Sequence, residues 1–392
     1  MNVSHQISGN KLVLLQSGTE YFPRLCADID AARHSIYLET YIFAADQTGR
    51  MIVDALQRAA ARGVSVRLLL DGFGSSELPQ QWLDDLSAAK IQVRWFRREI
   101  SPFTLRRNRH RRLRRMHRKM AVMDARVAFV GGINIINDIP RHSNLSAPQL
   151  DYAVRVKGSV AGEIHAAMRH LWSVVSWASL RRRGKRIKRL VRNAKRPATS
   201  PDISLILRDN VRHRHDIERE YMNAIEGAQR EIILANAYFL PGRGFRQALI
   251  QAANRGVRVV LLLQGRVEYW IQHYATHALY DELLEAGVEI YEYQASYLHA
   301  KVAVVDGSWA TVGSSNIDPF SLLLAREANL SVRHADFAGE LRASLLGVID
   351  QDSVRVGDEY GLARSWLDRL VARLSYVMVR LLIGMLGYGK SI

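Results

Sequence analysis

The chain has 392 residues, 48% of them apolar, so it is long enough to build two globular domains that each bury a core. Its formal net charge of +17 indicates an anionic partner, either nucleic acid or the surface of an anionic membrane, and charge alone does not decide between them. The single cysteine, Cys26, excludes an internal disulfide bond and a cluster of thiolate metal ligands.

Short apolar runs alternate with amphipathic stretches along the first half of the chain. We expect strands at residues 35–43, 64–72, 91–96 and 119–124, and helices at residues 51–63, 78–90 and 163–177. This alternation predicts an α/β lobe built around a sheet.

The second half repeats this order of elements. Strands are expected at residues 231–239, 257–265, 288–293, 301–306 and 328–333, and helices at residues 245–256 and 277–287. Two similar α-β-α sandwich lobes are therefore predicted, with their sheets face to face. We place the first lobe at residues 1–180, a basic linker at 181–202, the second lobe at 203–350 and an amphipathic C-terminal tail at 351–392.

One eight-residue segment occurs twice. HRKMAVMD at residues 117–124 recurs as HAKVAVVD at residues 299–306. The FVGGIN that ends at Asn134 is matched, at the same displacement, by the TVGSSN that ends at Asn316. Chance does not readily place so many polar identities in one register, so each half of the chain carries the same set of reactive residues.

The repeated residues suit chemistry at a phosphorus atom. Residues two apart in a strand project from the same face, so His117 lies beside Lys119 and His299 beside Lys301. A lone histidine in a strand is usually structural, but two copies in register favour catalysis. One imidazole would attack phosphorus, and the other would protonate the leaving alkoxide.

The oxygens of the phosphoryl group also need partners. We expect both lysines to hold them together with Asn134, Asn316 and Ser314. Because these groups can handle a tetrahedral anion unaided, and no plausible set of metal ligands accompanies them, we expect neither a metal nor a cofactor.

Four acids accompany the two motifs. Asp151 and Glu327 follow the asparagines in comparable strand contexts, and a carboxylate bonded to one imidazole nitrogen sets the tautomer of the other. Asp124 and Asp306 complete the repeated catalytic motif. Their odd spacing from the histidines directs them to the other face of the strand, where we expect them to fix its end.

Both H-x-K-x4-D motifs, with their G-x-x-N tails, resemble the phospholipase D superfamily. The segments ETYIFAAD, LLLDGFGS, NAYFLPG and ATVGSSNIDPFSL extend the resemblance to bacterial cardiolipin synthases, especially their shorter B group, over nearly the entire chain. This resemblance implies a pseudo-dimer of lobes with one shared active site. It also implies a phosphohistidine intermediate on His117, with His299 as acid and then base.

In that scheme one phosphatidylglycerol donates its phosphatidyl group, glycerol leaves, and a second phosphatidylglycerol attacks to give cardiolipin. Phosphatidylethanolamine stays open as a partner, as does hydrolysis of phospholipids or transfer to other alcohols. A nuclease is disfavoured, because aromatic residues that stack bases do not interleave the arginines. The first half has Glu39 where the second has no acid, and it has GGIN where the second has GSSN. Different roles for the two halves of the site, including any role of Glu39, therefore stay open.

Two regions indicate contact with a membrane. Nine arginines between Arg97 and Arg115 crowd an insertion before the first motif, with Phe103 among them. Residues 365–389 predict a helix with a narrow stripe of Arg369, Arg373 and Arg380 on an apolar surface. We expect it to lie along the lipid interface, and the alternative is a helix buried against the second lobe.

The N-terminus does not have the pattern of a secretory signal, and no apolar run reaches the length of about 18 residues that a membrane span needs. We therefore expect a peripheral protein on the cytoplasmic face of the cell membrane. The sequence does not indicate a protein partner.

Overall fold

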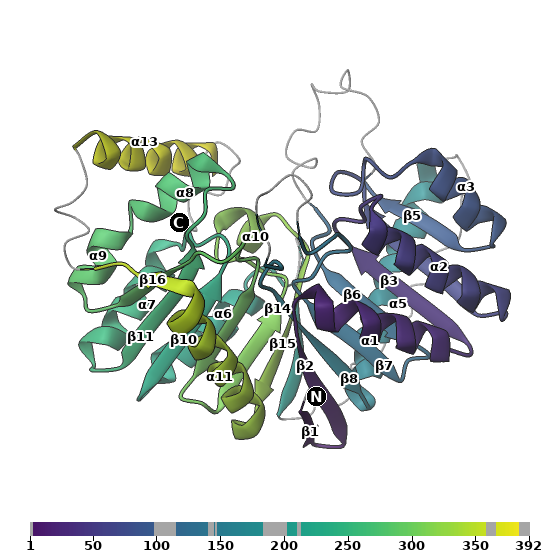
Figure 1. Ribbon diagram of the computed structural model, residues 1–392, viewed down its shortest axis with the longest axis horizontal. Helices are drawn as coiled ribbons and strands as arrows, with labels where there is room; N and C mark the ends of the chain where they lie inside the picture. Colours follow the sequence, from purple (N-terminus) through teal and green to yellow (C-terminus); the bar gives the residue numbers. More distant parts are fainter. Residues whose placement is uncertain are drawn as a thin grey trace.

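The structure is a computed structural model that describes residues 3–97, 115–139, 145, 147–182, 202–209, 213–357 and 366–383. Within these ranges two α/β lobes lie side by side (Figure 1). The first lobe contains β1 (Ser4–Ile7), β2 (Asn10–Gln16), α1 (Ser17–Ala31), β3 (Ser35–Thr40), α2 (Gln47–Ala61), β4 (Ser65–Asp71), α3 (Gln80–Ala88), β5 (Gln92–Phe96), β6 (Lys119–Met123), β7 (Val127–Gly131), β8 (Tyr152–Lys157) and α5 (Ser159–Arg182).

The second lobe repeats most of these elements. It contains β9 (Ile203–Arg208), α6 (Asp216–Gly227), β10 (Glu231–Asn236), α7 (Arg243–Asn254), β11 (Arg258–Gln264), α8 (Trp270–His277), α9 (Tyr280–Glu285), β12 (Glu289–Tyr293), β13 (Lys301–Val305), β14 (Trp309–Gly313), α10 (Pro319–Leu323), β15 (Glu327–Arg333), α11 (Ala335–Asp352) and β16 (Ser353–Arg355). A last helix, α13 (Trp366–Ile383), follows.

Seven strands follow the same order in both sheets, and β1 and β16 each add an eighth strand, at opposite edges. Their strand orders are β1-β2-β8-β7-β6-β3-β4-β5 and β16-β12-β11-β10-β13-β14-β15-β9. In each sheet three neighbouring strands, β3-β4-β5 or β10-β11-β12, are parallel, and the remaining pairs are antiparallel. The strands that carry the repeated motif, β6 and β13, therefore occupy the same position in each lobe.

Both faces of each sheet are buried, which explains why the central strands are unbroken apolar runs. Alternate residues of β6 show the division: Met120 and Val122 belong to a core shared by both lobes, whereas Ala121 and Met123 belong to the outer core under α1 and α2. The shared core also contains Val312 and Leu330 of the second sheet, with α5 and α11 at its margins. The predicted pair of similar lobes with facing sheets is confirmed.

The hairpin β1-β2, which the sequence analysis did not include, ties the lobes together. It extends the first sheet next to β8, and Nε2 of His5 lies 2.6 Å from Oε2 of Glu340 on α11. Farther along the interface, the hydroxyl groups of Tyr152 and Ser344 are 2.7 Å apart. Polar contacts thus supplement the shared apolar core.

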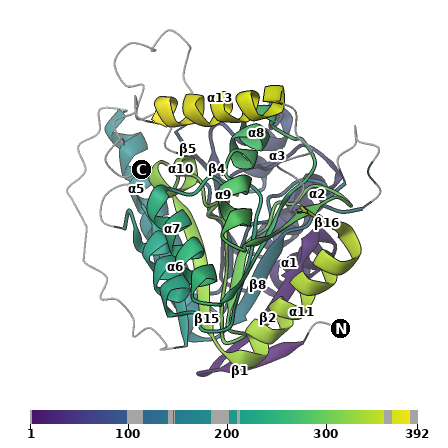
Figure 2. The ribbon, with the colours of Figure 1, turned by 90° about the vertical axis from the view of Figure 1, so that its left-hand side faces the viewer.

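The helix α13 lies across α8, at one side of the second lobe (Figures 1 and 2). Its buried face carries Ala372, Ser375 and Val379, and its opposite face exposes apolar side chains. These are Leu367, Leu370, Val371, Leu374, Val377, Met378 and Leu381. One face of this helix therefore packs on the second lobe, as one expectation stated. The opposite face is the apolar surface that the other expectation directed toward lipid.

No helix in the ranges that the structure describes is long and apolar enough to cross a membrane. The arginine-rich insertion at residues 98–114, most of the basic linker and the side chain of Arg369 lie outside the described residues. The domain limits chosen from the sequence stay predictions.

Candidate active site

The two repeated histidines stand where the lobes meet. The backbone N–H of His117 donates to the carbonyl of Arg326 in the second lobe, 2.9 Å away. In the same way the N–H of His299 donates to the carbonyl of Leu150 in the first lobe, at 2.8 Å. The main chain of each lobe therefore anchors the histidine of the other.

Each imidazole also contacts a carboxylate from the opposite lobe. Nδ1 of His117 lies 3.0 Å from Oε1 of Glu327, and Nδ1 of His299 lies 2.6 Å from Oδ2 of Asp151. Each acid directly follows the residue whose carbonyl anchors that histidine, so one main-chain pairing positions both. When Nδ1–H is donated to a carboxylate, the lone pair of the neutral ring is on Nε2.

Burial lowers the pKa of both imidazoles, because the charged ring is disfavoured away from water. For His299, burial and the neighbouring Lys301 bring the pKa to about 3. Burial likewise lowers the pKa of Lys119 well below its ordinary value and that of Lys301 to about 8. At neutral pH both rings are neutral and able to accept a proton at Nε2.

The lysines lie directly behind the histidines. Both are buried, and the ammonium group of each donates to the main-chain carbonyl of the histidine two residues before it. For Lys119 that bond to His117 is 2.8 Å long. Each lysine also acts electrostatically on the histidine of the other lobe, which places all four groups in one centre.

A cavity of about 730 Å³ lies between the lobes, and His117 and His299 both line it. Asn134 and Asn316 line it as well. Oδ1 of Asn134 accepts the N–H of Ile42 at 3.2 Å, which leaves the amide N–H groups of this asparagine for a ligand. The volume is typical of a site for a small molecule or a lipid headgroup.

Ser314 is fully buried and does not line this cavity. Its hydroxyl donates to Oε2 of Glu327 at 2.6 Å and accepts the N–H of Ala328. At the matching position in the first lobe, a Cβ on Gly132 would lie 2.2 Å from Oδ1 of Asp151. The structure thus gives Ser314 a supporting contact with Glu327, its expected contact with substrate stays a prediction, and the space at Gly132 explains why the first lobe has glycine where the second has Ser314.

The motif aspartates lie away from the reactive rings. Each follows the last residue of its strand, with a backbone φ of 53°. Asp124 accepts the N–H groups of residues 33–35, and Asp306 accepts those of residues 229–231, at 2.8 to 2.9 Å. Their carboxylates therefore join the end of the reactive strand to the start of β3 or β10.

Two supporting side chains were missed in the sequence. Oδ2 of Asp71 accepts the N–H of Met116 at 2.8 Å, and Oε1 of Gln264 accepts the N–H of Leu298 at 2.7 Å. Both hold the residue just before a reactive histidine. The signal was available, because Asp71 and Gln264 occupy the same place in the repeated segments LLLDG and LLLQG.

Glu39 forms a buried ion pair with Arg118, 2.6 Å apart. Burial raises the pKa of this carboxyl, while Arg118 opposes the rise. The matching positions in the second lobe are Ala235 and Ala300, so both partners are missing there together. This ion pair occurs in the first lobe and not at the matching positions of the second, and neither of its residues lines the cavity.

In the part of the chain that the structure describes, no three His, Cys, Asp or Glu residues are grouped so as to hold a metal ion. His273 and His277 do stand one turn apart on α8. The ring of His277 stacks on Tyr280 with centroids 4.5 Å apart, and its Nε2 lies 3.2 Å from Glu292.

Comparison with known proteins identifies relatives. The family model described as cardiolipin synthase, PLD-like domain, matches residues 25–172 and 221–348. Cardiolipin synthase B of Shigella flexneri and that of Escherichia coli are each 38% identical to this chain over 382 residues, which is 97% of this chain and 90% of theirs. A phosphatidylserine synthase structure from Haemophilus influenzae has a TM-score of 0.70 at 12% identity, covers 99% of this chain and 96% of its own, and is alike in fold.

Proposed function

The chain belongs to the phospholipase D-like family of cardiolipin synthases, and we propose that it joins two phosphatidylglycerol molecules into cardiolipin and releases glycerol. It is a phosphatidyltransferase that acts on phospholipids. The observation that supports this most strongly is that two imidazoles, each held at Nδ1 by a carboxylate of the opposite lobe, line one cavity.

In the first half-reaction, Nε2 of His117 attacks the phosphorus of the donor lipid. A P–N bond forms, the P–O bond to glycerol breaks, and His299 gives a proton to the leaving oxygen. His299 is neutral in the empty site, but the phosphodiester anion beside it favours the imidazolium, so the ring takes up this proton as substrate binds.

In the second half-reaction, a hydroxyl group of another phosphatidylglycerol attacks the phosphohistidine. His299 accepts the proton of that hydroxyl, a P–O bond forms and the P–N bond to His117 breaks. Lys119, Lys301 and the two asparagines offset the charge on the phosphoryl oxygens in both steps. Attack by water in place of the lipid hydroxyl would give phosphatidic acid.

We also propose that the protein docks on an anionic membrane through α13. Leu374 and Leu381 on its outward face are 59% and 61% exposed, an arrangement that costs free energy in water and gains it at a lipid interface. Arg373 and Arg380 flank this apolar face, where their charges reach the headgroups. The net charge of +17 adds a general attraction.

The activity is tested with labelled phosphatidylglycerol in detergent and a chelator. Cardiolipin and free glycerol are expected; His117→Ala should release neither, and His299→Ala should make no cardiolipin and release at most one glycerol per chain. Phosphatidic acid as the only product would redirect the assignment to hydrolysis, and cleavage of single-stranded DNA without lipid turnover would redirect it to a nuclease.

Membrane docking is tested by flotation with vesicles that contain phosphatidylglycerol. Leu374→Glu should reduce the bound fraction, whereas Val354→Glu, at an equally exposed valine on β16, should not. Equal binding of the two variants would contradict the role of α13.

A further inference from the structure

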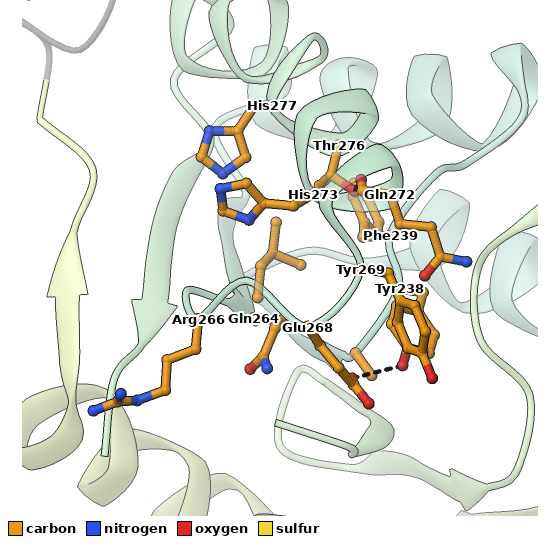
Figure 3. A pocket seen from close by; sticks show the side chains of 12 residues that line it. Tyr238, Phe239, Gln264, Arg266, Glu268, Tyr269, Gln272, His273, Thr276 and His277 are labelled. Atoms are coloured by element: carbon orange, nitrogen blue, oxygen red, sulfur yellow. Dashed lines mark hydrogen bonds between the residues drawn. The ribbon is translucent and has the colours of Figure 1, made fainter. Parts of the chain in front are cut away.

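An acid stands at the rim of the cavity on the side of the second lobe. Glu268 belongs to the loop between β11 and α8, and its carboxylate accepts a hydrogen bond of 2.7 Å from the hydroxyl of Tyr238 (Figure 3). Both side chains line the cavity that contains the histidines. The tyrosine fixes the carboxylate in place and occupies only part of its capacity to accept hydrogen bonds.

This acid does not suit the phosphate. A carboxylate donates no hydrogen bonds and repels a phosphodiester anion, whereas the asparagines that line the cavity carry amide N–H groups and the buried lysines supply positive charge. The ligand that fits a carboxylate is a donor, such as the hydroxyl groups of a polyol. Glu268 must therefore serve a part of the substrate beyond the phosphorus.

Glu268 lies on the side of the cavity where the alcohol is expected to bind. Burial raises the pKa of Glu268 and lowers the pKa of Lys301 to about 8, and the opposite charges of the two groups partly offset these shifts in each other. The two groups are thus within electrostatic range, and Lys301 lies behind His299. His299 is the ring that exchanges a proton with the leaving and the attacking alcohol in the proposed reaction.

The matching position in the first lobe does not carry an acid. When the segments LLLDG and LLLQG are superimposed, Glu268 corresponds to Ser75. Ser75 is buried, donates its hydroxyl to the carbonyl of Tyr41 and accepts the N–H of Phe43. The other acids that line the cavity, Asp46, Asp138 and Asp318, accept backbone N–H groups, whereas Glu268 is paired with the hydroxyl of a tyrosine.

We propose that Glu268, positioned by Tyr238, is a specificity-determining residue that binds the free hydroxyl groups of the glycerol headgroup. This inference rests on the proposed function, because it assigns the alcohol of that same transfer. Glycerol leaving the donor and the glycerol headgroup of the acceptor both pass the side of the cavity that holds His299 and Glu268. The acid would thereby favour a polyol over an alcohol with one hydroxyl group.

The test is a competition between two acceptors. Purified full-length protein receives phosphatidylglycerol with radiolabelled glycerol and propan-1-ol at equal concentrations, and the products of transfer to each are separated. Propan-1-ol has the same carbon chain and lacks the two further hydroxyl groups. The variants are Glu268→Gln and Glu268→Ala, with Glu285→Gln, an exposed glutamate on α9, as the matched control.

The ratio of transfer to glycerol over transfer to propan-1-ol is expected to fall at least about tenfold in Glu268→Ala, which corresponds to one lost hydrogen bond to a charged group. The KM for glycerol should rise while the KM for propan-1-ol does not, and Glu285→Gln should retain the original ratio. A ratio within about twofold of the unmodified protein would overturn the inference. In a parallel reaction with ethanolamine in place of propan-1-ol, a larger loss of transfer to ethanolamine than to glycerol would also overturn it, because the subsite would then serve an ammonium group.

Failure of the proposed function would look different. In that case the unmodified protein would transfer the phosphatidyl group to neither alcohol. Transfer by the unmodified protein with an unchanged ratio in both Glu268 variants would leave the function intact and remove Glu268 from headgroup selection.

Discussion

Replacing Asp151 with asparagine should change which nitrogen of His299 carries the proton. Oδ1 of Asp151 accepts the N–H of Tyr152 at 2.7 Å, so the carbonyl oxygen of an asparagine would keep that contact. Its amide nitrogen would then face Nδ1 of His299, where Oδ2 now lies at 2.6 Å. Because an amide nitrogen only donates, Nδ1 would become the acceptor and the proton would move to Nε2.

Both half-reactions should be slowed by this change. A neutral ring with the proton on Nε2 could protonate leaving glycerol only by becoming an imidazolate, and it has no lone pair at Nε2 with which to accept the proton of the second lipid hydroxyl. Turnover is expected to fall on the order of 10³- to 10⁴-fold, the scale of a wrong histidine tautomer in a related arrangement. Both the phosphohistidine on His117 and cardiolipin should therefore form more slowly than in the unmodified protein.

The assay is a rapid quench with labelled phosphatidylglycerol, measuring protein-bound label and cardiolipin over time. Asp54→Asn, at an exposed position on α2, is the matched control. Because Asp151 is only 3% exposed, its replacement could disturb packing, and circular dichroism is used to check that the isosteric variant is folded. Turnover within about tenfold of the unmodified protein would refute the proposed role of Asp151.

Three further outcomes follow from the site. Gly132→Ala should reduce turnover by about 10- to 100-fold, because its Cβ would displace the carboxylate of Asp151. Ser314→Ala should reduce turnover less, and equal reductions in the two variants would contradict this expectation. Since the pKa of Lys301 is about 8, kcat/KM should fall as the pH rises through that value and the ammonium loses its charge; a profile flat to about pH 10 would contradict it. Asp124→Asn should lower the free energy of unfolding in urea by about 1 kcal/mol, and lost activity at undiminished stability would argue against its structural role.

Much of the fold could be predicted from the sequence, because apolar periodicity and the repeat depend on local order. The central strands and the duplication were recognisable for that reason. The exchange of carboxylates between lobes was not, since it depends on Arg326 and Leu150 pairing with segments far away in the chain. The contact between Ser314 and Glu327 was not predicted, because sequence spacing does not show whether a hydroxyl faces the cavity or the carboxylate behind the ring.

The helix α13 illustrates a different limit. A helical projection separated its arginines from its apolar side chains, but it could not divide the apolar residues between protein and solvent. In the structure Ala372 and Val379 are buried, and Leu374 and Leu381 are exposed. Only the position of α8 beneath the helix decides which residues belong to each group.

The most direct test of a single site shared by both lobes is the stoichiometry of the covalent intermediate. The unmodified protein, His299→Ala and His117→Ala are each mixed with phosphatidylglycerol labelled in its phosphatidyl group, quenched, digested, and analysed by mass spectrometry. We predict at most one phosphatidyl-histidine per chain, located at His117, and no label in His117→Ala. Label on both histidines of the unmodified protein at two per chain, or turnover that persists when either ring is removed, would contradict the account.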